Sequence, residues 1–213
     1  MKISQGKDDI IPRDKWITPE DLHGEEKVLN SPLMMEAFNF IIENYSTNNK
    51  IAFISLCTTS RPYYKSYKWY RIKKDFKKYF SIGIDLLVCS NGGIIPEKYW
   101  ESYPYLSYDA HREPEYDDLY KDKLYERMIK FFSNIRFDYV IADFRPTQRN
   151  RTPVERALKV LKNEGIIIDY FISPSIEIFE KMKGVKEYKG FTAAGNMFPT
   201  FNPMSYYELI HKI

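Results

Sequence analysis

Ile51-Ala52-Phe53-Ile54-Ser55-Leu56-Cys57 is the stretch of sequence that decides the fold of this chain. A continuous apolar run of this length, rich in Ile and Phe, predicts a strand that is buried in a parallel sheet. The residues after Lys65 predict a helix, which makes this stretch the start of a strand-helix unit. Because α/β sheets place their ligand sites at the carboxyl ends of strands, we expect Cys57 to lie where a ligand binds.

The remaining predicted elements alternate between helices and strands. Ser31-Pro32 predicts a helix start, with Ser as the N-cap and Pro in the first turn. Further buried strands are predicted over 84–89, 137–142 and 166–172. Helices are predicted over 119–134, from a capping box that begins at Thr152, after Ser173-Pro174 and over 204–212, and loops over 94–118 and 191–203. This alternation predicts an α/β fold, a three-layer sandwich with a mostly parallel sheet.

Length and composition set the class of protein. At 213 residues, the chain is expected to form a partly irregular N-terminal arm over 1–30 and a single α/β domain over 31–213. No apolar run approaches the roughly 20 residues of a membrane helix, and the N-terminus lacks the order of a signal peptide. Two cysteines do not make a disulfide framework. We therefore expect a cytoplasmic protein that does not enter a membrane.

Basic and aromatic side chains are interleaved after the first strand. Residues 61–80 hold eight basic residues and one acid, although the net charge of the whole chain is only +3. Basic groups bind phosphates and aromatic rings stack on bases, so this segment predicts a nucleic-acid contact through Lys65, Lys68, Trp69 and Arg71. The alternative is a solvated amphipathic helix whose aromatic residues face the core.

A second basic segment follows the predicted strand that ends at Asp143. Arg145, Arg149 and Arg151 lie in one loop before the next helix. Free N–H groups at a helix start, with arginines beside them, form a good phosphate site. The segment therefore predicts a second nucleic-acid contact, with an exposed basic loop as the alternative.

The segment from Leu56 to Trp69 resembles the core motif of the archaeosine synthase family, PCxxxKPYxxSxxH. Cys57, Pro62, Tyr63 and Ser66 stand at matching positions, whereas Leu56, Arg61 and Trp69 replace the first Pro, the Lys and the His. A second stretch resembles the G-x-x-P, Y-P and Y-D run of that family, in the residues Gly93, Pro96, Tyr103-Pro104 and Tyr108-Asp109. The resemblance covers roughly residues 30–145.

This resemblance implies an enzyme that adds the side-chain amine of free lysine to the nitrile of 7-cyano-7-deazaguanine in tRNA. Cys57 is then the candidate nucleophile, because a thiolate at a strand end near a helix start is stabilised by the dipole and by Arg61. A buried, inert cysteine is the alternative. The predicted catalytic residues are Cys57, Arg61, Ser66 and Asp109, and the predicted substrate-binding residues are Pro62, Tyr63, Gly92, Gly93 and Asp143.

The expected partners are tRNA or another nucleic acid, with free lysine as a co-substrate. Relatives usually carry a transglycosylase-like domain and a PUA-type RNA-binding domain, so we expect either a partner chain that supplies them or a smaller substrate. No cofactor is expected, and no residue cluster has the spacing of metal ligands. Two alternatives stay open: a catalytically degenerate nucleic-acid-binding accessory subunit, and a related 7-deazaguanine modification of DNA.

Overall fold

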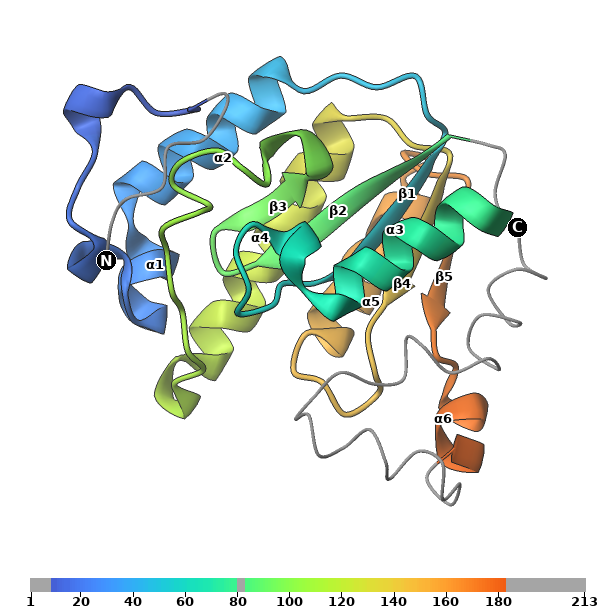
Figure 1. Ribbon diagram of the computed structural model, residues 1–213. Coiled ribbons are helices and arrows are strands. Elements are labelled where there is room, and N and C mark those ends of the chain that lie inside the picture. The colour runs from blue at the N-terminus through green and yellow to red at the C-terminus, as the bar shows by residue number, and fades with distance from the viewer. Residues whose placement is uncertain (1–8, 80–82, 183–213) are drawn as a thin grey trace.

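The computed structural model describes residues 9–79 and 83–182, and these ranges hold one five-stranded sheet. Its strands lie in the order β3-β2-β1-β4-β5 (Figure 1). Every neighbouring pair is parallel except β2 and β3, which are antiparallel. The strands are β1 (Ile51–Leu56), β2 (Ile84–Ser90), β3 (Gly93–Pro96), β4 (Tyr139–Asp143) and β5 (Asp169–Ser173).

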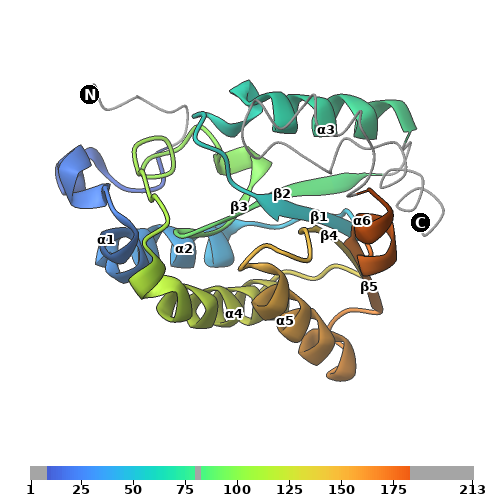
Figure 2. The ribbon, with the colours of Figure 1, turned by 90° about the horizontal axis from the view of Figure 1, so that it is seen from below.

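Helices cover both faces of the sheet (Figure 2). One face is covered by α3 (Tyr67–Tyr79), and the other by α2 (Pro32–Asn44), α4 (Asp117–Asn134) and α5 (Arg151–Asn163). Two shorter helices, α1 (Glu25–Asn30) and α6 (Ile176–Met182), lie at the two ends of the described chain. The predicted three-layer α/β fold with a mostly parallel sheet is confirmed.

The strongest sequence signals gave elements at the predicted positions. Ser31 caps α2, since its Oγ accepts a hydrogen bond from the Met34 N–H at 3.3 Å. The apolar face of α2 is buried through Leu33, Met34, Ala37, Phe38 and Ile41. β1 is buried along nearly its whole length, as expected for a central strand with neighbours on both sides.

Several predicted boundaries are wrong. The long loop predicted over 94–118 begins too early, because Gly93–Pro96 is the antiparallel edge strand β3. α5 begins at Arg151 after Asn150, so Thr152 lies inside the helix and forms no capping box. The last two predicted strands begin later than expected, because the ladders of β4 and β5 start at Tyr139 and Asp169. The loop and helix predicted over 191–203 and 204–212 lie outside the described residues.

The paired glycines of the β2–β3 turn are explained by packing. A Cβ atom at Gly92 would lie 2.1 Å from Met34 Cε, and one at Gly93 would lie 2.6 Å from the Phe38 ring. Gly93 also has a φ of +131°, which side chains rarely adopt. These glycines let α2 approach the sheet closely, so they have a packing role in place of the predicted substrate binding.

Residues 9–30, predicted as a partly irregular arm, contribute to the same core as the rest of the described chain. Ile10, Ile11, Leu22, Val28 and Leu29 are all buried in it. His23 and Asp109 form a β-bridge in which the Asp109 N–H donates to Leu22 O at 3.0 Å. This segment is thereby attached to the loop that precedes α4.

Among the helices of the described ranges, none combines the length and apolar character needed to cross a membrane.

Candidate functional site

The candidate site lies between β1 and β4, where the chain connections of the sheet change direction. The β1–β2 connection runs through α3 on one face, and the β4–β5 connection runs through α5 on the other. The chain therefore departs in opposite directions from the carboxyl ends of the neighbouring strands β1 and β4. Such a switch point is where open α/β sheets bind ligands. Cys57 directly follows β1, and Asp143 is the last residue of β4.

Cys57 is a free, half-buried thiol at this point. Its N–H donates to Cys89 O at 2.9 Å, which extends the pairing of β1 with β2 by one residue. Its thiol interacts electrostatically with Arg61, Lys68 and Tyr108. A helix start was expected near Cys57, but α3 begins only at Tyr67 and does not directly follow the thiol in the sequence. The charged groups that act on the thiol are instead the side chains of Arg61 and Lys68.

A lysine and an aspartate lie beside the thiol. Lys68 Nζ is 3.7 Å from Asp143 Oδ2, and the two side chains are only 12% and 5% exposed. Asp143 also accepts a 2.6 Å hydrogen bond from Ser55 Oγ, which holds the carboxylate in place. Burial lowers the pKa of the Lys68 ammonium, and the attraction of Asp143 opposes that change. A lysine of this kind exchanges protons more readily than an exposed one.

Arg61 lies between two tyrosine rings. Its guanidinium carbon is 4.4 Å from the Tyr63 ring centroid and 4.7 Å from that of Tyr108. The two hydroxyls are 2.7 Å apart, so the rings are joined to each other. Burial alone would lower the pKa of Arg61, but its interactions with Tyr63, Tyr108 and Cys57 raise it. The guanidinium is therefore a fixed positive charge beside the thiol, and burial raises the pKa of Tyr108 to about 12.

This arrangement supports nucleophilic chemistry at an electrophilic carbon. It places a nucleophile, a proton-exchanging ammonium–carboxylate pair and a fixed cation around one point. Among the residues that the structure describes, no group of His, Cys, Asp and Glu side chains is placed to hold a metal ion. The second thiol, Cys89, is fully buried, and burial raises its pKa strongly, so the two cysteines differ in reactivity.

Four motif residues near Cys57 cap a helix, pack in the core or support Arg61, and none of them is open to a ligand. Ser66, predicted as catalytic, caps α3, because its Oγ accepts from the Trp69 N–H at 3.2 Å. Trp69, predicted to contact nucleic acid, is 0% exposed and packs on Phe53 and Trp100, so it offers no stacking surface. Pro62 and Tyr63, predicted to bind substrate, are buried, and Tyr63 instead holds Arg61.

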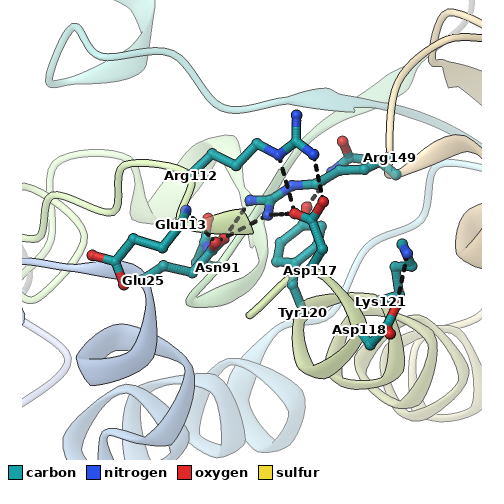
Figure 3. Close-up of polar contacts among 10 residues, drawn as sticks. Glu25, Asn91, Arg112, Glu113, Asp117, Asp118, Tyr120, Lys121 and Arg149 are labelled. Carbon is teal, nitrogen blue, oxygen red and sulfur yellow. Dashed lines mark hydrogen bonds and ion pairs between the residues drawn. The ribbon is translucent and has the colours of Figure 1, made fainter. Parts of the chain in front are cut away.

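Arg149, predicted to bind nucleic acid, belongs to a buried ion network (Figure 3). Its guanidinium donates to both carboxylate oxygens of Glu25 and to Asp117 Oδ1, the last at 2.6 Å. It also stacks on Tyr120, with 3.9 Å between the guanidinium carbon and the ring centroid. Glu25 is 0% exposed. These contacts satisfy the arginine within the protein, so the prediction is corrected.

Of the other predicted residues, some have structural contacts and one is exposed. Arg151 donates to the carbonyls of Phe144 and Pro174 and so connects the ends of β4 and β5. Asp109, predicted as catalytic, is attached to the N-terminal segment and lies 3.1 Å from His111. Lys65 is exposed, as a nucleic-acid contact requires. The side chain of Arg71 lies outside the described parts.

The partners of Cys57 were only partly predicted. The basic neighbours of Lys68 predict a nucleic-acid contact, but its ammonium interacts with the thiol. The sequence indicates Tyr108 only as part of the Y-D motif. The motif itself was the available signal, since its tyrosine is 3% exposed and contacts Arg61.

Comparisons with known proteins place few limits on this site. No family model matches the chain, and no curated protein matches it. Among solved structures, the chain is similar to the crystal structure of AF0587, a protein of unknown function, at 13% sequence identity and a TM-score of 0.47. That alignment covers 74% of this chain and 48% of the other, so the chain spans about half the length of that protein.

Proposed function

We propose that this chain transfers an amine, lysine in the first instance, to the nitrile of 7-cyano-7-deazaguanine in tRNA, with Cys57 as the nucleophile. The observation that carries this proposal is the half-buried thiol at the switch point, with Lys68 and Asp143 beside it. The resemblance of the surrounding sequence to archaeosine synthases supplies the substrate class.

The proposed reaction has two steps that balance without a redox partner. In the first, the Cys57 sulfur bonds to the nitrile carbon, and the thiol proton goes to the nitrile nitrogen, which gives a thioimidate. In the second, the amine nitrogen bonds to the same carbon, the carbon–sulfur bond breaks, and an amine proton restores the thiol. The net product is an amidine.

The remaining site residues have defined roles in this scheme. Lys68, with Asp143 beside it, relays protons to the developing negative nitrogen and from the attacking amine. Its lowered pKa suits a group that must both give and accept a proton. Arg61 supplies a fixed positive charge. It stands where the family motif has a lysine, so the position keeps a cationic side chain.

The test is an adduct assay with labelled lysine and tRNA that bears the cyano base. Digestion and mass measurement of the nucleosides should show a lysine adduct. Cys57→Ser should abolish the adduct, and Cys89→Ser, which changes the fully buried thiol, should retain it. Unchanged turnover in Cys57→Ser would contradict the nucleophile role. An absent adduct with tRNA binding intact would favour an accessory subunit.

The accessory alternative is supported by a different surface. Tyr67 and Tyr70 are 44% and 56% exposed and, with the exposed Lys74, fall at helical spacing along α3. Aromatic and basic side chains in one stripe suit base stacking and phosphate contact. Tyr70→Ala should then weaken RNA binding, and binding should fall steeply with salt. The same surface would serve DNA in the third alternative, and competition between the two nucleic acids separates them.

A further inference from the structure

Two arginines at the switch point, Arg61 near Cys57 and Arg145 two residues after Asp143, lack anionic partners among the described residues. Arg61 and Arg145 form no ion pair with any carboxylate of the described residues, and the Nε of each is buried without a hydrogen bond. A buried donor left unpaired is unfavourable, so such donors usually have a partner in the working state of a protein.

The contacts of Arg61 determine where it can bind. Its guanidinium carbon lies over the Tyr63 and Tyr108 rings, it interacts with the Tyr108 hydroxyl, and one of its nitrogens donates to Ser60 O at 3.3 Å. The remaining donors lie in the guanidinium plane, at its edge. A planar edge with paired donors matches the two oxygens of a carboxylate or phosphate.

Arg145 follows the neighbouring strand of the switch point, β4. It follows Asp143 by two residues at the end of β4, and its backbone is held by a 2.7 Å bond from its N–H to Gln148 Oε1. Its charge acts on Lys68, which itself lies beside the thiol. Arg61, Lys68 and Arg145 therefore bring three cationic side chains to a site in which Asp143 is the carboxylate in contact. Such an excess of positive charge favours an anionic ligand.

We propose that Arg61 and Arg145 bind an oxyanion of the substrate beside Cys57. The inference extends the proposed function, because an oxyanion has two sources there: the carboxylate of an amino-acid co-substrate and a phosphate next to the modified nucleotide. In either case the arginines position the substrate and do not take part in bond formation.

Alkylation of Cys57 tests this binding without turnover. The full chain is treated with iodoacetamide under native conditions at constant ionic strength, and modification of Cys57 is followed by mass spectrometry. Acetate and inorganic phosphate are the first probes, with chloride as the control. Lysine is then compared with lysine amide, which keeps both amines but lacks the carboxylate, and a nucleoside monophosphate is compared with the nucleoside.

We expect saturable protection of Cys57 by one of the oxyanions. Arg145→Gln should raise the half-protecting concentration by about tenfold or more, as for loss of a charge-assisted contact. Arg61→Lys provides a second variant, and Arg156→Gln, an exposed arginine of α5, is the matched control and should behave as wild type. Protection by lysine but not lysine amide assigns the carboxylate, and protection by the monophosphate but not the nucleoside assigns the phosphate.

Absent protection, or equal protection in wild type and both site variants, would overturn the inference. Circular dichroism of each variant establishes that it is folded. Protection without an amine adduct would leave the oxyanion site standing and remove only the proposed reaction. An adduct formed without protection would support the proposed reaction and remove the oxyanion site.

Discussion

Replacing Arg149 by Met should destabilise the protein strongly, because it leaves a buried carboxylate without its cation (Figure 3). Glu25 is 0% exposed and would keep only the Asn91 amide at 2.6 Å and the Glu113 N–H at 2.9 Å. Breaking a buried ion pair by removing one partner costs about 3–5 kcal/mol. Since those two donors remain and Asp117 is 19% exposed, we expect the lower end, about 3 kcal/mol.

The assay is urea unfolding at pH 7, analysed for the free energy of unfolding. Arg112→Met is the matched control, because Arg112 pairs with the same Asp117 but is 60% exposed, so its removal should change stability far less. Adding Glu25→Gln to Arg149→Met should recover part of the loss, because it removes the unpaired charge. A wild-type free energy of unfolding in Arg149→Met, together with weaker RNA binding, would refute this reasoning and restore Arg149 as a nucleic-acid contact.

The pH dependence of that loss has a definite sign. Burial raises the pKa of Glu25, but Arg149 and the surrounding hydrogen-bond donors lower it by more. The net result is a pKa below the ordinary value for Glu. Arg112 and Arg149 likewise lower the pKa of Asp117. Stability from a lowered carboxylate pKa is present above the unfolded value of about 4 and is lost as the pH falls through the folded value. The difference in free energy of unfolding between wild type and Arg149→Met should therefore be largest at pH 7 and should become smaller below about pH 4.

Three further predictions test the packing and the two thiols. Gly93→Ala should cost about 1–3 kcal/mol in urea unfolding, from its clash with a ring of α2 and its positive φ; Gly165→Ala, which also has a positive φ but nothing within 4 Å, should cost only the backbone part of about 1 kcal/mol. Trp69→Ala should cost about 3–5 kcal/mol in the same assay, because a fully buried indole is removed; a nucleic-acid role would instead lower RNA affinity at unchanged stability. Iodoacetamide should modify Cys57 in the native protein and Cys89 only after unfolding, which peptide mass mapping can distinguish.

Local sequence signals predicted the first helix and strand of the sheet layers, α2 and β1. The apolar run of β1 and the Ser31-Pro32 cap of α2 are decided by neighbouring residues, and both were predicted at the observed positions. The edge strand β3 was missed because it has four residues and ends on Pro96. Its existence depends on antiparallel pairing with β2, and the turn residues that permit this pairing also suit a loop.

Long-range partners explain the errors in the site. Arg149 reaches Glu25 across 124 residues of sequence, and no local pattern indicates that pairing. Lys68 and Trp69 are neighbours in one basic, aromatic segment, yet α3 turns one toward Asp143 and the other into the core. Helical periodicity predicts that such residues point in different directions, but it does not reveal which side faces the sheet.

The arginines of this chain show what distinguishes a structural cation from one that awaits a ligand. Arg149 and Arg151 are partly buried, and protein oxygens accept hydrogen bonds from both. Arg61 and Arg145 are also partly buried, but each keeps an unpaired Nε at the switch point of the sheet. A folded chain leaves local rules unsatisfied mainly where function requires it. Because Arg61 interacts with the half-buried thiol and Arg145 follows the neighbouring strand, a substrate bound there would supply the partner that each Nε lacks.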